Sequence, residues 1–144
     1  MAVNDTYIDL SPKRLWSLVL ARPETYDRWV VGAADIRDAD PNWPAVGSTF
    51  QHTVGFGPLR LKDHTEVVAA EPAQRLSVRA KTRPFGEAQV VLELKAEGYG
   101  TRVTMSEQPV EGVMARLYNG AMDLALRGRN EETLRRLKDV AEHS

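Results

Sequence analysis

The sequence lacks cysteine, and it also lacks any long apolar run. Without cysteine, neither a disulfide framework nor a catalytic thiolate can form. Without an apolar stretch of roughly 20 residues, no helix can span a bilayer. The opening residues, 1–16, have neither the basic start nor the apolar centre of a secretory signal. We therefore predict a cytoplasmic location and no integral membrane association.

An excess of charge of either sign is missing too. The chain has 19 basic and 20 acidic residues, with a formal net charge of -1. No basic tract is interleaved with aromatic side chains, as a nucleic-acid-binding surface would require. We therefore predict that nucleic acid is not a partner.

Short signatures of metal and cofactor chemistry are equally absent. The sequence contains no H-E-x-x-H, no G-x-S-x-G and no Walker loop. Gly55-x-Gly57 is followed by a proline and a strand pattern, so it does not match a dinucleotide fingerprint. We predict neither a metal nor a cofactor.

The sequence does contain a series of strand patterns followed by one long helical pattern. With 144 residues, 42% hydrophobic and 27% charged, the chain fits a single domain over residues 1–144. A first strand ends near residues 6–10, and apolar and polar side chains then alternate over residues 47–56, 59–67, 76–83, 88–94 and 103–107. Antiparallel strands closed by a long helix predict an α+β fold, with the helix laid across the sheet.

Two short helices are predicted after the first strand. Ser11-Pro12 supplies an N-cap and a first helical residue, and Leu15 begins an apolar face. Arg22-Pro23 restarts the pattern, with Tyr26 and Trp29 on the second helix. Helices this short are marginal alone in water, so we expect both to pack on the sheet.

The final helical pattern covers residues 113–143. Its first half carries a stripe at three- and four-residue steps, namely Met114, Leu117, Tyr118, Ala121, Leu124, Ala125 and Gly128. Leu134, Leu137 and Ala141 lie about half a turn away from this stripe. Either the helix bends near Gly128, or its last turns pack on the first strand or on another subunit of a homodimer. We predict the bend, with the stripe facing the sheet.

A hairpin brings two polar residues together on the apolar face of the sheet. With Gly57-Pro58 as a two-residue turn, His52 faces Asp63 across the strand pair. An imidazole oriented by a carboxylate in a cavity can act as a general base. The alternatives are a structural hydrogen bond or a register slip that separates the two residues. We predict the structural role.

The chain resembles the polyketide cyclase/dehydrase-like branch of the START/Bet v 1-type superfamily, called SRPBCC. The segments that carry this resemblance are spread over nearly the whole chain, as residues 11–16, 26–29, 43–50, 100–103 and 129–138. The resemblance implies a helix-grip fold, a seven-stranded antiparallel curved sheet around a long C-terminal helix with a hydrophobic cavity between them. Members bind lipids, sterols, polyketides or plant hormones, and a minority are cyclases or hydrolases.

The candidate ligand-binding residues follow from strand parity and from the helix stripe. Glu107 points inward near a strand end, where it would bind a polar ligand group or reach water. Trp29 and Trp43 are candidates for the cavity rim, although Trp29 could instead pack the two short helices together. The full set is Trp29, Trp43, Phe50, Leu61, Val90, Met105, Glu107, Met114, Tyr118 and Ala121.

Three functional hypotheses follow. The first is a protein that binds a small hydrophobic or amphipathic molecule, such as a lipid, a polyketide or an aromatic metabolite. The second is a cyclase or dehydratase that uses His52 and Asp63. The third is a protein-interaction module with a filled core and an exposed apolar patch. We favour the first.

Overall fold

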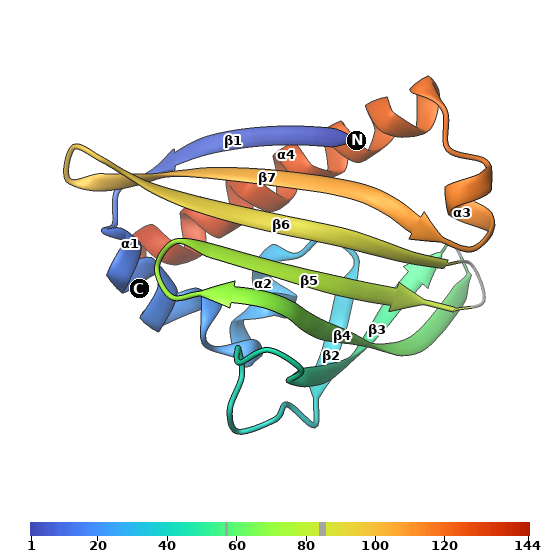
Figure 1. Ribbon diagram of the computed structural model, residues 1–144, viewed down its shortest axis with the longest axis horizontal. Coiled ribbons are helices and arrows are strands. Elements are labelled where there is room, and N and C mark those ends of the chain that lie inside the picture. The colour runs from blue at the N-terminus through green and yellow to red at the C-terminus, as the bar shows by residue number, and fades with distance from the viewer. Residues whose placement is uncertain (57, 84–85) are drawn as a thin grey trace.

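The computed structural model describes residues 1–56, 58–83 and 86–144, with the side chains of Phe56, Val113 and Met114 outside the description. The predicted turns at Gly57-Pro58 and Pro84-Phe85-Gly86 therefore lie partly outside the described residues. Antiparallel strands form one seven-stranded sheet in the order β1-β7-β6-β5-β4-β3-β2 (Figure 1). The strands are β1 Ala2–Ile8, β2 Ala33–Arg37, β3 Thr49–Phe56, β4 Leu59–Glu71, β5 Arg75–Thr82, β6 Gly86–Glu97 and β7 Gly100–Glu111.

The helices cover the inner face of this curved sheet. A short α1, Pro12–Leu15, continues into a π-helical turn, Trp16–Leu20, and a 3-10 turn, Pro23–Thr25, leads into α2, Tyr26–Trp29. A single turn of helix, α3, Val113–Arg116, precedes the long α4, Gly120–Glu142. Figure 1 shows α4 crossing behind the sheet. This arrangement confirms the predicted helix-grip fold. Among the described residues, no helix is both long enough and apolar enough to cross a membrane.

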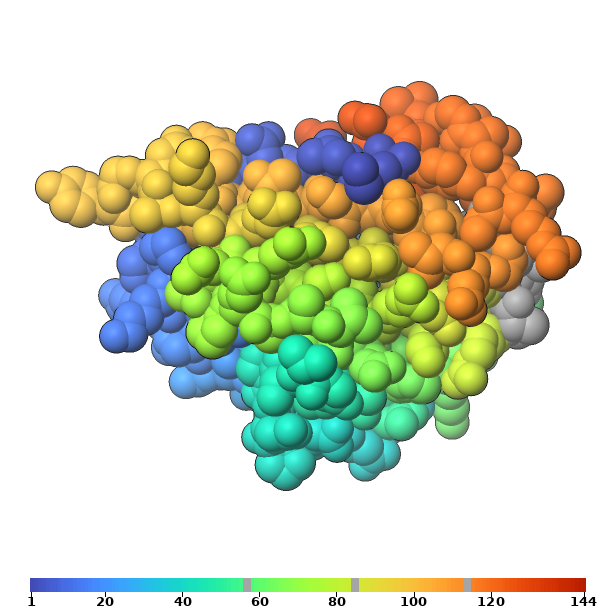
Figure 2. Space-filling model, in the orientation of Figure 1, coloured from blue at the N-terminus to red at the C-terminus, as the bar shows by residue number. Residues whose placement is uncertain are grey.

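The outer face of the sheet is covered by side chains, and one hairpin extends beyond it. Figure 2 shows this face, with the hairpin of β6 and β7 projecting from the body of the molecule. Tyr99 lies in the turn of that hairpin and is 96% exposed.

The strand register agrees with the alternation in the sequence. Across β3 and β4, Phe50 pairs with Thr65 and His52 pairs with Asp63. The predicted inward residues Val67, Leu92 and Val103 are buried. A β-bulge between Val67 and Ala69 then shifts the register of β4, which a strict alternation does not predict.

The core occupies one end of the space between the sheet and α4. Ile8, Leu15, Leu20, Leu76 and Leu137 are almost completely buried there. An aromatic cluster joins the short helices to β3, because Tyr26 contacts the rings of Trp29, Trp43 and Phe50. Tyr26 donates a hydrogen bond of 2.7 Å from its hydroxyl to the carbonyl of Leu20, and burial raises the pKa of that hydroxyl.

The prediction for the orientation of the last helix was wrong. Leu117 and Leu124 are 61% and 71% exposed, whereas Leu134 and Leu137 are buried against the core. Helix α4 is continuous through Gly128, and its last turns pack on β1, where Lys138 Nζ donates a bond of 2.7 Å to the carbonyl of Tyr7. The face of α4 that carries Leu134, Leu137 and Ala141 therefore packs on the first strand, which was one of the alternatives to a bend.

The interruption lies earlier, between α3 and α4. Asn119 has an extended backbone and accepts a bond of 3.0 Å from Met122 N–H through its side-chain Oδ1. This is an N-cap, and it starts a new helix with its own phase. Because the stripe was traced from Met114 across this cap, it identified the exposed face of α4.

Candidate functional site

A cavity of about 350 Å³ lies between the sheet, α2 and α4. Val54, Val78, Val90 and Met105 contribute the sheet wall, while Met122 and Leu126 contribute the helix wall. A volume of this size is within the range of small-molecule sites.

Small side chains on the sheet leave room for the cavity. One row of paired residues crosses the inner face from Thr65 on β4 to Ala80 on β5 and Ala88 on β6. All three line the cavity. Further along the same face, beyond the row of Val78 and Val90, the row of Leu76, Leu92 and Met105 carries large side chains. The sheet is therefore packed at one end and hollow toward the other.

The cavity is enclosed at one end and open at the other. Tyr26, Trp29 and Phe50 form its aromatic end and are each less than 5% exposed. At the opposite end, Ala125 is exposed and the Arg129 side chain is 43% exposed. The cavity wall therefore reaches from buried aromatic rings at one end to partly exposed helix residues at the other.

Five of the predicted ligand-binding residues lie in the cavity wall, and His52 lies there as well. The five are Trp29, Phe50, Val90, Met105 and Glu107. Trp29 also packs against Tyr26, so its two predicted roles occur together.

Four other predicted residues lie outside the described lining of the cavity. Trp43 belongs to the aromatic cluster but does not line the cavity, and its indole N–H donates to the carbonyl of Leu20 at 3.1 Å. Leu61 lies toward the β3–β4 turn. Ala121 is exposed on α4, and Tyr118 precedes the helix and donates its hydroxyl to Asp123. The side chain of Met114 is outside the described residues.

None of the residues that α4 contributes to the wall was predicted as a ligand-binding residue, although Ala125 belonged to the stripe expected to face the sheet. These are Met122, Ala125, Leu126, Arg129, Asn130 and Thr133. They follow a helical spacing, but the last three are polar and interrupt the apolar pattern. The signal that could have found them was the pair Leu134 and Leu137, because extending that face backward by helical steps leads to Leu126 and Asn130.

His52 is held by two hydrogen bonds, neither of which involves Asp63. Its Nε2 lies 2.9 Å from the carbonyl of Lys81, and its Nδ1 lies 2.9 Å from Thr65 Oγ1. A carbonyl only accepts, so Nε2 carries the proton and Nδ1 accepts from the Thr65 hydroxyl. Burial lowers the pKa of His52, which agrees with a neutral ring.

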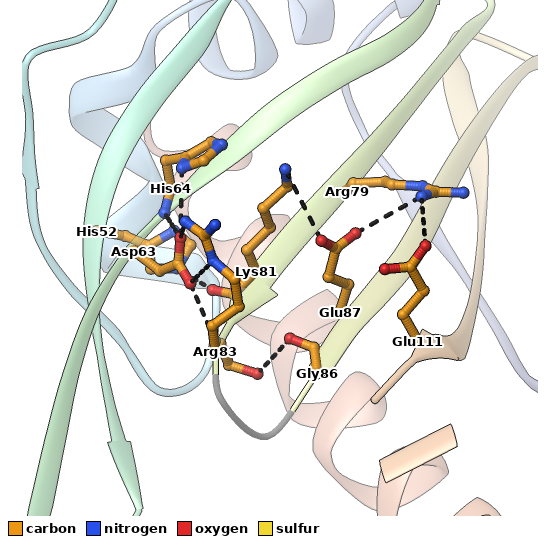
Figure 3. A network of polar contacts seen from close by, with 10 residues as sticks. His52, Asp63, His64, Arg79, Lys81, Arg83, Gly86, Glu87 and Glu111 are labelled. Atoms are coloured by element: carbon orange, nitrogen blue, oxygen red, sulfur yellow. Dashed lines mark hydrogen bonds and ion pairs between the residues drawn. The ribbon is translucent and has the colours of Figure 1, made fainter. Parts of the chain in front are cut away.

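Asp63 belongs to a separate network, in which Arg83 and His64 both contact its carboxylate (Figure 3). Its carboxylate accepts bonds from the Arg83 backbone at 3.0 Å, from the Arg83 guanidinium at 2.9 and 3.1 Å, and from His64 N–H at 2.9 Å. Burial raises the pKa of Asp63, but these hydrogen bonds outweigh it and lower the pKa to about 2.

Both networks compensate for an incomplete strand pairing. The ladder between β4 and β5 runs from Glu71–Arg75 to Thr65–Ala80. Beyond it, His52 binds the carbonyl of Lys81 and Asp63 binds the N–H of Arg83. These side chains thus take up backbone groups that a neighbouring strand would otherwise satisfy.

Glu107 and Arg129 connect the sheet to α4 at the cavity wall. Arg129 Nη2 donates to both carboxylate oxygens of Glu107, at 2.7 and 2.9 Å. The Glu107 side chain is only 4% exposed. The prediction that Glu107 faces inward is confirmed, but its described partner is an arginine of the helix.

The described residues offer no cluster of three or more His, Cys, Asp or Glu side chains that could hold a metal ion. What the cavity presents is a mostly apolar surface with a few polar groups. Such a surface can bind an apolar molecule and orient it through hydrogen bonds.

Solved structures of low sequence identity share this fold. Protein NE0264 from Nitrosomonas europaea is 16% identical with a TM-score of 0.73, over 98% of this chain and 93% of that chain. CalU16 from Micromonospora echinospora is 18% identical with a TM-score of 0.64, over 96% and 74% of the two chains. Ara h 8.0201 is 8% identical with a TM-score of 0.71, over 99% and 97%. These likenesses show the fold alone, and they agree with the predicted helix-grip fold.

One sequence family matches almost the whole chain. Its profile, described as polyketide cyclase / dehydrase and lipid transport, matches residues 2–142. No curated protein matches the chain in sequence. The match confirms the resemblance that the sequence segments indicated.

Proposed function

Because the chain belongs to the polyketide cyclase / dehydrase and lipid transport family, we propose that it binds a small hydrophobic or amphipathic molecule between the sheet and α4. Lipids, polyketides and aromatic metabolites are the classes we include. Cyclisation, dehydration and transport all begin with binding such a molecule, so binding is the function that each of these activities requires.

The observation that carries this proposal is the cavity itself. Its wall is built mainly from apolar side chains, and its volume is about 350 Å³. Transfer of apolar surface from water into such a site is favourable by roughly 25 cal/mol for each Å² removed from water. The packed core beside the cavity gives the wall a fixed shape before any ligand arrives.

The experiment is a binding assay with prodan, a neutral naphthalene dye whose emission depends on its surroundings. Ala80→Trp would place an indole inside the hollow row of the sheet and should abolish prodan binding. Ala121→Trp is the matched control, because Ala121 is exposed on the outer face of α4. We expect the control to bind prodan as the unmodified protein does. Equal binding by both folded variants would place the dye elsewhere and contradict the proposal.

Catalysis by His52 is the second candidate function, supported by its place in the cavity wall. Its two ring nitrogens are hydrogen-bonded to Thr65 and Lys81, and this favours a structural role over proton transfer. A His52→Gln variant that binds a ligand normally but no longer converts it would establish catalysis.

We further propose a cytoplasmic location, and we keep the homodimer and the interaction module as predictions. A native mass spectrum of the protein purified from its own host tests the binding function and the homodimer together. A retained small molecule would support binding, and the mass of the complex would give the oligomeric state.

A further inference from the structure

One side chain in the cavity wall has polar groups that nothing in the described protein satisfies. Asn130, on α4, is 0% exposed and lies in the lining of the cavity. Neither its Nδ2 nor its Oδ1 has a hydrogen-bond partner among the described residues. Most buried polar groups are hydrogen-bonded, so a carboxamide unsatisfied at both atoms calls for an explanation.

The other polar side chains of the wall are already engaged. Thr133, one turn further along α4, accepts a bond of 3.2 Å from Val31 N–H. Arg129 binds Glu107, and both ring nitrogens of His52 have partners. Asn130 therefore differs from these side chains in having both a donor and an acceptor unused.

The charged groups around the cavity are balanced as well. The Glu107 carboxylate is paired with Arg129, and Glu87 lies 3.8 Å from Lys81 and 3.6 Å from Arg79. A ligand carboxylate would add an anion to a wall whose buried carboxylate is already neutralised. Because Arg129 is already paired with Glu107, that anion would be buried without a cationic partner. A neutral ligand group avoids this cost.

We propose that Asn130 is the hydrogen-bonding anchor of the cavity, and that its ligand is a neutral, mostly apolar molecule with an adjacent donor and acceptor. A carboxamide is the simplest group of this kind. Its carbonyl accepts from Asn130 Nδ2, and its N–H donates to Oδ1. This inference rests on the proposed binding function and specifies the chemistry of its ligand.

Three naphthalene probes of similar size separate the possibilities by isothermal titration calorimetry. 2-Naphthamide has a donor and an acceptor, 2-acetonaphthone has an acceptor only, and 2-naphthoate is an anion. We expect the amide to bind roughly tenfold more tightly than the ketone, the effect of one added hydrogen bond to a group that is already desolvated. The naphthoate should bind more weakly than the amide.

Asn130→Leu tests whether this residue is the source of the preference. The variant should bind the amide and the ketone equally, and without ligand it should melt no lower than the unmodified protein, because an unsatisfied polar group has been removed. Asn130→Ala serves the same purpose with less side-chain volume. Met105→Leu is the control, since it alters the shape of the wall alone and should change both affinities by the same factor.

The outcomes distinguish this inference from the binding function. If neither the amide nor the ketone binds the unmodified protein, the proposed function itself fails. If both bind equally, the cavity binds apolar molecules but Asn130 is not their anchor. A preference that survives in Asn130→Leu, or a large loss of melting temperature in that variant, would also overturn the role of Asn130.

Discussion

Arg129 Nη2 lies 2.7 Å from one carboxylate oxygen of Glu107 and 2.9 Å from the other, so one charged pair bridges α4 and β7 at the cavity wall. The two members differ in exposure, because the carboxylate is buried and the guanidinium is partly exposed. Removing the arginine should therefore change the stability of the protein by a different amount than removing the charge of the glutamate.

Arg129→Met should lower the free energy of unfolding by about 1–3 kcal/mol, because it leaves a buried carboxylate unpaired. Glu107→Gln should cost less, since it removes the buried charge. Urea denaturation measures both. Arg127→Met, which breaks the exposed pair with Asp123, is the control and should cost at most about 1 kcal/mol. Equal losses in all three variants would show that the buried pair has no special weight.

The two faces of α4 can be compared directly by truncating one leucine on each. Leu137 is 0% exposed, so Leu137→Ala should destabilise the protein by about 2–5 kcal/mol. Leu124 is 71% exposed, and Leu124→Ala should change stability by no more than about 0.5 kcal/mol. Thermal or urea unfolding gives both values. A larger loss of stability in Leu124→Ala than in Leu137→Ala would instead support the helix orientation expected from the sequence stripe.

The buried imidazole of His52 predicts a loss of stability in mild acid. Burial lowers its pKa below the ordinary value of 6.5, so the unfolded chain binds a proton there while the folded protein does not. Stability should therefore fall as the pH drops below that value. Unfolding curves at about pH 7.5 and about pH 5.5 measure the slope. His52→Gln should reduce it, and His143→Gln, which changes an exposed residue, should not. A His52→Gln protein with an unchanged slope would contradict the assignment.

Asp63 predicts a second loss in stronger acid. Its pKa is about 2 in the folded protein against an ordinary value of 3.8, so the carboxylate stabilises the fold above the higher value. This contribution should disappear as the pH falls through that interval. Asp63→Asn should cost about 1–3 kcal/mol near neutral pH, because four N–H donors of Arg83 and His64 lose a charged acceptor. The difference between the two proteins should shrink near pH 2, as measured by denaturant unfolding. A constant difference would point to packing alone.

The strands could be predicted because their pattern is local. An alternation of side chains fixes which face is buried, and the pairing of His52 with Asp63 follows from a two-residue turn. The hydrogen bonds of these residues could not be predicted in the same way. Their partners Lys81 and Arg83 lie on or next to β5, and they become available only because β4 and β5 stop pairing near Thr65.

The helix was harder to predict because its inner face is polar where it borders the cavity. Arg129, Asn130 and Thr133 do not look like core residues, whereas Leu117 and Leu124 do. Hydrophobic periodicity assumes that a buried face is apolar, and a binding cavity violates that assumption. The Asn119 cap added a second error, since it separates two helices whose phases need not agree.

The strands and α4 are held in place by different kinds of bonds. Neighbouring strands share backbone ladders, but the described hydrogen bonds from α4 to β1, β7 and the turn after β1 each involve a side chain, as between Asn4 and Arg127 or between Asp9 and Glu142. A small displacement of the helix would exchange a few of these bonds and leave every ladder intact. The range of molecular sizes that fit would then depend on where the helix rests, with the strands acting as a rigid frame.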